Sequence, residues 1–222
     1  MTTILHLDSS ARQGTSKESA FGSHTRRLSA RFVQRWCAIH PDDKIIYRDL
    51  GANPPTPPSG NWIHAAFTAP SQREPWMHEV LVQSDELTRE LMDADLIVAG
   101  VPMYNFNVPA QFKAYIDNIV RVGVTFGFDR SRTGEPYWPL LSDYNKRLVL
   151  LGSRGDYGYG KGQRIEHMNH VERSVETAMA YIGITDVYSA AVEYDEFADN
   201  RLKASIEEAE ALVDAMVLRL AS

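Results

Sequence analysis

Cysteine is almost absent from this chain of 222 residues, whose one thiol is Cys37. A single thiol cannot close an internal disulfide, and it leaves no C-x-x-C pair or cysteine metal cluster. This usage suits a reducing compartment such as the cytoplasm. Cys37 falls within an apolar helical pattern, so we expect it to be buried filler.

Long hydrophobic runs are also missing. No segment approaches the roughly 20 apolar residues of a transmembrane helix, and residues 1–7 enter a strand-like run without the features of a secretory signal. Basic residues are in deficit, with 23 Lys and Arg against 29 Asp and Glu and a net charge of −6. An acidic surface repels phosphate backbones. We therefore expect a cytoplasmic protein with neither a membrane nor a nucleic acid as partner.

Two common hydrolase motifs are missing as well. The chain has no G-x-S-x-G elbow and no H-E-x-x-H zinc motif. His167 and His170 stand three residues apart and in principle suit a metal, but a solvated helix face explains the same spacing. We predict no metal site.

What the chain does have is a regular alternation of strand and helix patterns. Short apolar runs typical of buried strands occupy residues 3–7, 44–50, 96–101, 147–151 and 186–192, and helical spacing occupies 23–39, 74–94, 109–120, 164–182 and 198–220. Alternation implies parallel strands joined by right-handed helical crossovers. We predict an α/β fold in which residues 1–222 form one domain. Its doubly wound, five-stranded parallel sheet has the flavodoxin-like strand order 2-1-3-4-5.

Ligands of such folds bind beyond the carboxyl ends of the strands, so the loops after strands one, three and four are the candidate site. The first loop, residues 9–25, is rich in hydroxyls and runs into a helix start, which favours an anion. Ser10, Ser23 and Thr25 offer hydroxyl donors to a phosphate, and Arg12 offers charge. The same residues also fit a surface loop in which Ser23 only caps the helix.

The other two loops favour a planar ligand. Residues 103–107, Met-Tyr-Asn-Phe-Asn between two prolines, form a rigid rim able to present backbone amides and flat faces to a heterocycle, although a turn with its aromatics in the core fits too. Residues 152–162 contain five glycines, which let a backbone approach a ligand closely. A flexible surface loop is the alternative there.

In combination these segments resemble the FMN-dependent NADH-azoreductases and NAD(P)H:quinone oxidoreductases. The resemblance runs in the same order over nearly the whole chain. Its specific part is PMYNFNVPAQFKAYID at residues 102–117, and GVTF at 123–126 and YIGITDV at 181–187 also match. The matches of Ser9-Ser10 and of SRG at 153–155 would be weak alone.

The resemblance implies a homodimer holding one FMN per subunit near the dimer interface. The phosphate would sit on the loop after strand one, the second loop would contact the ribityl chain and isoalloxazine, and the third would border the ring on its other side. Carried over residue by residue, the cofactor-binding positions are Ser10, Ser23, His24, Thr25, Met103, Tyr104, Asn105, Phe106, Ser153, Arg154, Gly155 and Asp156.

The resemblance also implies a reaction. NADH or NADPH would deliver a hydride to the flavin and leave, and a small-molecule quinone or azo compound would then take two electrons in a ping-pong cycle. Such chemistry belongs to the cofactor, so we expect no side chain to be an obligatory acid or base. Asn105 and Phe106 are our first candidates for positioning the ring.

Three features depart from the family pattern. The first loop is longer than in the shorter members. Asp156 stands where the family often has a second glycine, which places a carboxylate near the flavin. Four prolines lie between residues 54 and 58, and we expect this loop and the excursion at 125–145 to wall a substrate slot.

Other functions of the same fold remain as alternatives. An electron-carrier flavodoxin has a compact phosphate loop, whereas this one is long. A nucleotide-phosphate enzyme is suggested by Gly155 to Lys161, which nearly spell a P-loop, but Gly162 stands where Mg²⁺ needs a Ser or Thr hydroxyl. A phosphate-accepting receiver domain needs an aspartate where strand three ends Gly-Val-Pro, at residues 100–102.

Overall fold

The computed structural model describes residues 1–221 and contains one sheet of five parallel strands. Its order across the sheet is β2 (Lys44–Asp49), β1 (Thr3–Asp8), β3 (Leu96–Pro102), β6 (Arg147–Ser153) and β7 (Asp186–Val192). Numbered by their place among these five strands, this is the predicted order 2-1-3-4-5. The fold class is therefore confirmed.

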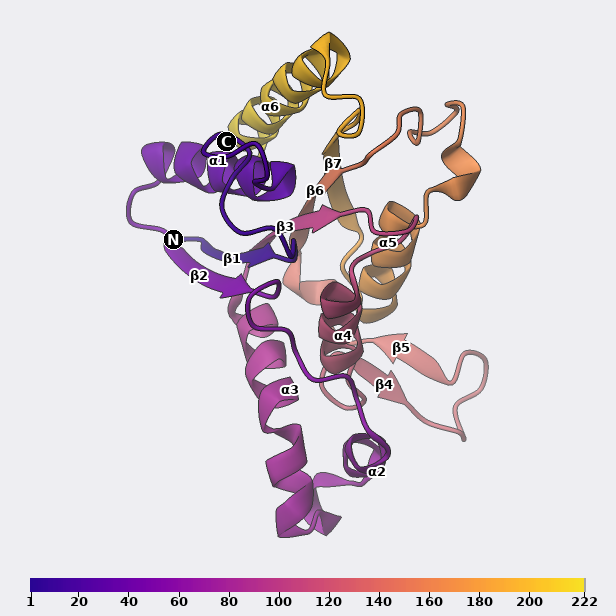
Figure 1. Ribbon diagram of the computed structural model, residues 1–222. Helices are drawn as coiled ribbons and strands as arrows, with labels where there is room; N and C mark the ends of the chain where they lie inside the picture. Colours follow the sequence, from indigo (N-terminus) through magenta and orange to yellow (C-terminus); the bar gives the residue numbers. More distant parts are fainter. Residues whose placement is uncertain (222) are drawn as a thin grey trace.

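Helices cover both faces of the sheet (Figure 1). Helices α1 (His24–Ile39) and α6 (Asn200–Leu220) lie on one face, and α3 (Pro75–Asp93), α4 (Ala110–Ile119) and α5 (Val171–Ile182) lie on the other. Each face has its own hydrophobic core, one gathered around Phe32 and Val213 and the other around Phe112 and Val175. Most of the apolar residues that give the helical spacing are buried against the sheet, although Ile39 at the end of α1 is 45% exposed.

Strand β3 lies at the centre of the sheet, and all seven of its residues are buried. A strand covered on both faces has no solvent side, which is why its sequence is an unbroken apolar run. At Gly100 an added Cβ would lie 2.7 Å from Asp8 Oδ1 and 3.2 Å from the Thr25 carbonyl oxygen. The missing side chain lets the start of α1 approach the sheet closely.

Two elements were not expected from the sequence. The short helix α2 (Gly60–Phe67) follows the proline-rich loop and packs against α3 through Ala65 and Leu81. The excursion at 125–145 contains an antiparallel hairpin of β4 (Phe126–Phe128) and β5 (Tyr137–Pro139). Helix α2 has eight residues and the two strands have three each, which is too short for periodicity to reveal them.

One predicted helix start was wrong. Helix α5 begins at Val171 rather than near 164, after a single 3₁₀ turn at Glu166–Met168. The amide of His170 donates to the carbonyl oxygen of Phe106 at 3.0 Å, and Asn169 Oδ1 accepts from the Val171 amide at 3.1 Å. Because these two amides donate to the second loop and to the Asn169 side chain, they are not available for a further turn of helix before Val171. The remaining 3₁₀ turns are Pro70–Gln72 and Ser142–Tyr144.

Three smaller expectations can be compared with the structure. Cys37 is partly exposed, so its assignment as buried filler was wrong. Residues 1–221 contain no helix that combines the length and the apolar character needed to cross a bilayer. His167 lies in the 3₁₀ turn and His170 caps α5, so they do not share a helix face, and no group of metal-ligating side chains occurs within residues 1–221.

Candidate functional site

The carboxyl ends of β1, β3 and β6 lie side by side, with Asp8 opposite Gly100 and Pro102 opposite Ser153. The loops that follow these strands therefore meet at one edge of the sheet, as the sequence predicted. They enclose a cavity of about 160 Å³. It is lined by Ser10, Arg12, Ser23, His24, Pro102, Met103, Tyr104, Ser153, Arg154, Gly155, Asp195 and Glu196.

The first loop brings buried hydroxyls to the start of α1. Ser10, Ser23 and Thr25 are almost fully buried, and the hydroxyl oxygens of Ser23 and Thr25 lie 2.9 Å apart. Ser23 is the N-cap, since its Oγ accepts from the Arg26 amide at 3.3 Å. The amides of His24 and Thr25 find no acceptor among residues 1–221. Free amides at the N-terminus of a 16-residue helix make this helix start a candidate anion site.

The extra length of the first loop is closed by its own hydrogen bonds beside the start of α1. The Ser23 amide donates to the Gly14 carbonyl at 3.1 Å, and the Ser16 amide donates to the Ser23 carbonyl at 3.1 Å. These bonds close residues 14–23 into a compact excursion and return the chain next to Ser10. A Cβ on Gly22 would lie 2.0 Å from the Thr15 carbonyl oxygen, so only glycine lets the excursion close.

The second loop is a tight turn at residues 104–107. Tyr104 and Asn107 exchange two backbone hydrogen bonds, of 2.9 and 3.2 Å. Between them Asn105 and Phe106 have φ of 47° and 70°, a left-handed conformation that costs energy for residues other than glycine. Their side chains are exposed and stand outside the cavity, whereas Met103 and Tyr104 line it. The Tyr104 hydroxyl accepts from the Ala11 amide at 3.1 Å and thereby joins the second loop to the first.

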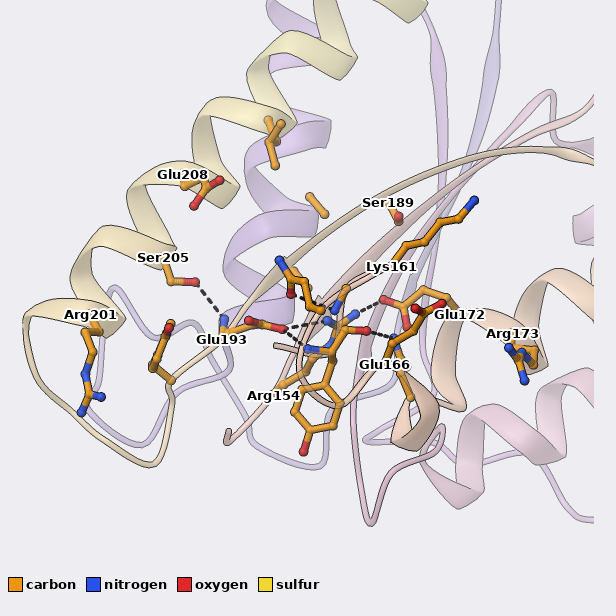
Figure 2. Close-up of a pocket in the computed structure, with 18 of the residues that line it drawn as sticks. Arg154, Lys161, Glu166, Glu172, Arg173, Ser189, Glu193, Arg201, Ser205 and Glu208 are labelled. Carbon is orange, nitrogen blue, oxygen red and sulfur yellow. Dashed lines mark hydrogen bonds and ion pairs between the residues drawn. The ribbon is translucent and has the colours of Figure 1, made fainter. Parts of the chain in front are cut away.

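Arg154 of the third loop forms ion pairs within the protein. Its buried guanidinium pairs with Glu172 of α5 and, at 3.0 Å, with Glu193. Glu193 also accepts from the amides of Gly158 and Tyr159. Arg154 therefore orders the glycine-rich loop. It also lines a wider, mixed-charge groove of about 790 Å³ between α5 and α6, along the open edge of β7 (Figure 2).

Asp156 is not among the residues that line the cavity. Its carboxylate accepts from Arg164 Nη2 at 2.6 Å and from the Tyr157 amide at 2.8 Å. The hydrogen bond from Arg164 holds the pKa of Asp156 below its usual value. Of the 12 sequence-predicted residues, the structure lines the cavity with Ser10, Ser23, His24, Met103, Tyr104, Ser153, Arg154 and Gly155, and places Thr25, Asn105, Phe106 and Asp156 around it.

Sequence reasoning missed two carboxylates that line the cavity, Asp195 and Glu196. Both follow β7, whereas the candidate loops predicted from the sequence follow strands one, three and four. Asp195 Oδ1 lies 3.1 Å from His24 Nε2, and its Oδ2 accepts from Arg12 Nη1 at 3.1 Å. The hydrogen bond with His24, assisted by the charge of Arg12, keeps the pKa of Asp195 below its usual value. The rule that ligands bind at carboxyl ends of strands would have included this loop.

The third loop does not form a nucleotide P-loop. In a P-loop the glycine-lysine stretch leads directly into a helix whose N-terminus faces the phosphates. Here nine residues separate Lys161 from the start of α5 at Val171, and Lys161 extends toward the groove beside β7 (Figure 2). The candidate anion site of this fold lies at the start of α1 instead.

Comparison with known proteins agrees with this geometry. A family model described as flavodoxin-like fold matches residues 2–214. The chain is 40% identical over 220 residues to FMN-dependent NADH:quinone oxidoreductase 2 of Colwellia psychrerythraea, covering 99% of this chain and 100% of that protein. It is 40% identical over 226 residues to the FMN-dependent NADH:quinone oxidoreductase of Opitutus terrae, covering all of both chains.

Solved structures share the fold at lower identity. An FMN-dependent NADH-azoreductase from Bacillus anthracis, solved in complex with FMN, superposes with a TM-score of 0.83 at 17% identity, covering 99% of this chain and 100% of that one. An azoreductase from the Sterne strain of B. anthracis gives a TM-score of 0.78 at 21% identity, covering 97% and 100%. The extent and identity of the sequence matches place this chain in the flavodoxin-like family of FMN-dependent NADH:quinone oxidoreductases.

Proposed function

We propose that this protein is an FMN-dependent oxidoreductase that passes two electrons from NADH or NADPH to small-molecule quinones and aromatic azo compounds. The observation that carries this proposal is the anion site at the start of α1. Amides without acceptors and the buried hydroxyls of Ser10, Ser23 and Thr25 converge there, at the edge of the cavity that the loops enclose. Two relatives at 40% identity are named FMN-dependent NADH:quinone oxidoreductases.

The donor set fits the phosphate of FMN. The amides of His24 and Thr25, with the hydroxyls of Ser10, Ser23 and Thr25, would hold its oxygens, since hydroxyl and amide donors bind phosphate well at a helix N-terminus. Arg12 lies beside them and is half-exposed, so it would add positive charge near the bound anion.

The second and third loops would hold the rest of the cofactor. Met103, Tyr104, Asn105 and Phe106 would lie along the ribityl chain and one side of the isoalloxazine. The segment from Ser153 to Asp156 would border its other side. The exposed ring of Phe106 is 43% accessible, which leaves a flat apolar face free for a planar partner.

Bound FMN would supply the two-electron chemistry, and the side chains of this protein would bind, orient and exclude water. NADH and the electron acceptor would use the same face in turn. The proposed kinetic order is therefore ping-pong, which predicts parallel lines in double-reciprocal plots when quinone concentration is varied at several NADH concentrations.

The visible absorption spectrum of the purified protein tests the proposal. A two-banded flavin spectrum that bleaches when NADH is added without oxygen, and returns when a quinone or azo dye follows, is the expected result. A protein that neither takes up FMN nor oxidises NADH contradicts it. A protein that binds FMN but does not turn over NADH with any acceptor would instead be an electron carrier.

We further propose that residues 1–222 act as one FMN-binding domain, and that two copies associate near the flavin. Exposed aromatic side chains at the rim of the site, including Tyr104 and Phe106, support an association there. Light scattering should give twice the chain mass of 25.0 kDa. A cytoplasmic location, suggested by the single cysteine, predicts recovery in the cytosolic fraction after cell fractionation.

A further inference from the structure

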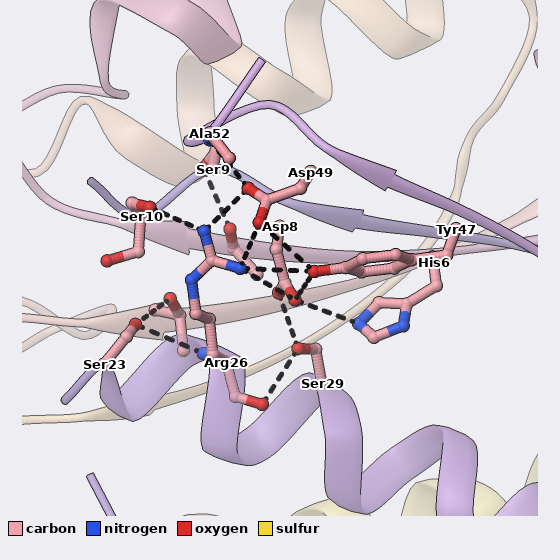
Figure 3. Close-up of polar contacts among 12 residues, drawn as sticks. His6, Asp8, Ser9, Ser10, Ser23, Arg26, Ser29, Tyr47, Asp49 and Ala52 are labelled. Carbon is pink, nitrogen blue, oxygen red and sulfur yellow. Dashed lines mark hydrogen bonds and ion pairs between the residues drawn. The ribbon is translucent and has the colours of Figure 1, made fainter. Parts of the chain in front are cut away.

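Arg26 lies beneath the first loop, and its guanidinium donates hydrogen bonds to two of that loop's carbonyl groups. Figure 3 shows the one to Ser10. Arg26 sits in the first turn of α1, and its side chain is 6% exposed. Its Nε donates to the carbonyl oxygen of Arg12 at 2.9 Å, and its Nη2 donates to the carbonyl oxygen of Ser10 at 2.9 Å. One side chain therefore holds both ends of residues 10–12.

The guanidinium is itself held from the opposite side. Both Nη atoms donate to the carboxylate of Asp49, at 2.8 and 2.7 Å, and Nη1 donates to the Tyr47 hydroxyl at 3.2 Å. Asp8 Oδ2 lies 3.6 Å from Nη1. The planar fork of arginine suits this bidentate pairing, which fixes the direction of its remaining donors toward the loop.

Arg26 does not line the cavity, so it has no direct contact with an anion placed there. Its effect on such an anion would be exerted through the loop. With the Ser10 and Arg12 carbonyls turned toward Arg26, their negative ends point away from the anion site. The peptide between Ser10 and Ala11 is held at both ends, because its carbonyl accepts from Arg26 and its amide donates to the Tyr104 hydroxyl.

A second close contact keeps the same peptide in place. A Cβ on Gly51, which directly follows β2, would lie 2.0 Å from the Ser10 carbonyl oxygen and 2.9 Å from Arg26 Nη2. The space around this contact is therefore filled by backbone and guanidinium. The loop has little room to rotate the Ser10 carbonyl back toward the cavity.

We propose that Arg26, anchored by Asp49, is a positioning residue for the cofactor phosphate: it holds residues 10–12 in the shape that presents Ser10 to the phosphate and turns two carbonyls away from it. The inference rests on the proposed function, which places the FMN phosphate at this loop. Arg26 would then help the protein to discriminate FMN from riboflavin, which lacks the phosphate, although Arg26 itself does not line the cavity.

The test is a pair of fluorescence titrations of the flavin-free full chain, one with FMN and one with riboflavin. We expect Arg26→Gln to raise the dissociation constant of FMN by about tenfold or more, since hydrogen bonds to charged groups are among the stronger ones. The dissociation constant of riboflavin should change by less than about twofold, because the ring-binding loops are untouched. Asp49→Asn keeps Arg26 but removes the charge that anchors it. This variant should also raise the ratio of the FMN dissociation constant to the riboflavin dissociation constant, by a smaller factor.

Arg27→Gln is the matched control. Arg27 is the next residue of α1 and pairs with Glu210 of α6 at 2.7 Å, away from the first loop. It should leave both dissociation constants unchanged. Arg26→Lys keeps the charge without the fork, so it should stay closer to Arg26→Gln than to the wild type.

The outcomes separate the inference from the function on which it rests. If Arg26→Gln changes the dissociation constants of FMN and riboflavin by the same factor, or changes neither, the positioning role is overturned while the proposed function stands. A wild-type protein that shows no preference for FMN over riboflavin overturns the proposed function and with it the inference. If Arg26→Gln fails to fold, the ratio measured for Asp49→Asn decides.

Discussion

Among single residues, Asp8 shows how a buried charge is stabilised next to the site. Its side chain is 5% exposed, and its carboxylate accepts from Ser29 Oγ at 2.7 Å and from the Tyr47 hydroxyl at 3.2 Å. Burial alone would raise the pKa of Asp8, but the contact with His6, whose Nε2 lies 3.5 Å from Oδ2, together with Ser29 and Arg26, holds it below the usual value. Burial and the nearby carboxylates raise the pKa of Tyr47 to about 12.

This lowered pKa predicts an acid-sensitive contribution to stability. A carboxyl whose pKa is lower in the folded than in the unfolded chain stabilises the fold above the unfolded pKa, about 3.9, and that contribution is lost as the pH falls through the folded pKa. Asp8→Asn should lower the free energy of unfolding by about 1–3 kcal/mol near pH 7 and should flatten its decline below about pH 4. Urea unfolding at several pH values measures both effects.

Asp117→Asn is the control for this series, because Asp117 lies on the exposed surface of α4 in a pair with Lys113. Surface pairs contribute little, so its unfolding curve should follow that of the wild type. The same pH dependence in wild type and Asp8→Asn would contradict the role assigned to Asp8.

Gly51 gives a second prediction for a single residue. An alanine there would bring Cβ to 2.0 Å from the Ser10 carbonyl oxygen, so the backbone must shift. We expect Gly51→Ala to cost about 1–3 kcal/mol of stability, measured by urea unfolding. Gly60→Ala, where nothing lies within 4 Å of the added Cβ, should be neutral or slightly stabilising; equal losses in both variants would exclude the close contact as the cause.

At the scale of elements, the turn at residues 104–107 carries the sequence segment most specific to the family. Its two left-handed residues position Tyr104 toward the first loop and leave the side chains of Asn105 and Phe106 exposed at the rim. Asparagine tolerates the left-handed conformation better than most residues, and glycine adopts it freely. The backbone and side-chain roles of Asn105 can therefore be separated.

We expect Asn105→Ala to weaken FMN binding by about tenfold, because it removes a hydrogen-bonding amide and adds strain to the turn. Asn105→Gly keeps the turn without strain and should still weaken binding if the side-chain amide contacts the flavin. Fluorescence titration with FMN and rapid-mixing measurement of flavin reduction by NADH are the readouts. Wild-type affinity and reduction rate in both variants would remove Asn105 from the site.

Across the whole molecule, the two hydrophobic cores lie on opposite faces of one sheet, and the site lies where the loops from both faces meet. Helix α1 is tied to α6 by ion pairs of Arg27 with Glu210 and of Arg31 with Asp214, both at 2.7 Å. The cavity also joins distant segments, since Arg12 and Asp195 are 183 residues apart. A ligand held there would stabilise the whole fold rather than one loop.

Linkage therefore predicts that FMN raises the stability of the protein. At about 100 times its dissociation constant, FMN should add about 2.7 kcal/mol to the free energy of unfolding. A thermal unfolding scan with and without FMN measures this, and riboflavin at the same concentration should give a smaller shift. No shift with FMN would contradict binding to the folded chain.

The sequence alone determined the sheet and most of its helices, because alternation and helical spacing record which face of each element is buried. It also located the three loops of the site, and Ser23 as a helix cap, since capping depends on residues next to it in the chain. These signals are local in the chain. The structure confirmed the number and order of the strands in the parallel sheet and the capping role of Ser23.

Only the tertiary structure decided what depends on distant partners. The start of α5 is set by a bond to the second loop, and the carboxylates beside the cavity proved to be Asp195 and Glu196, while Asp156 turned to Arg164. In the sequence Arg26 is one more polar position of α1, and only the structure shows that its guanidinium donates to carbonyl oxygens of the first loop. Such contacts depend on the register in which α1 crosses the sheet, which is fixed by packing across the whole fold and leaves no periodic trace in the chain.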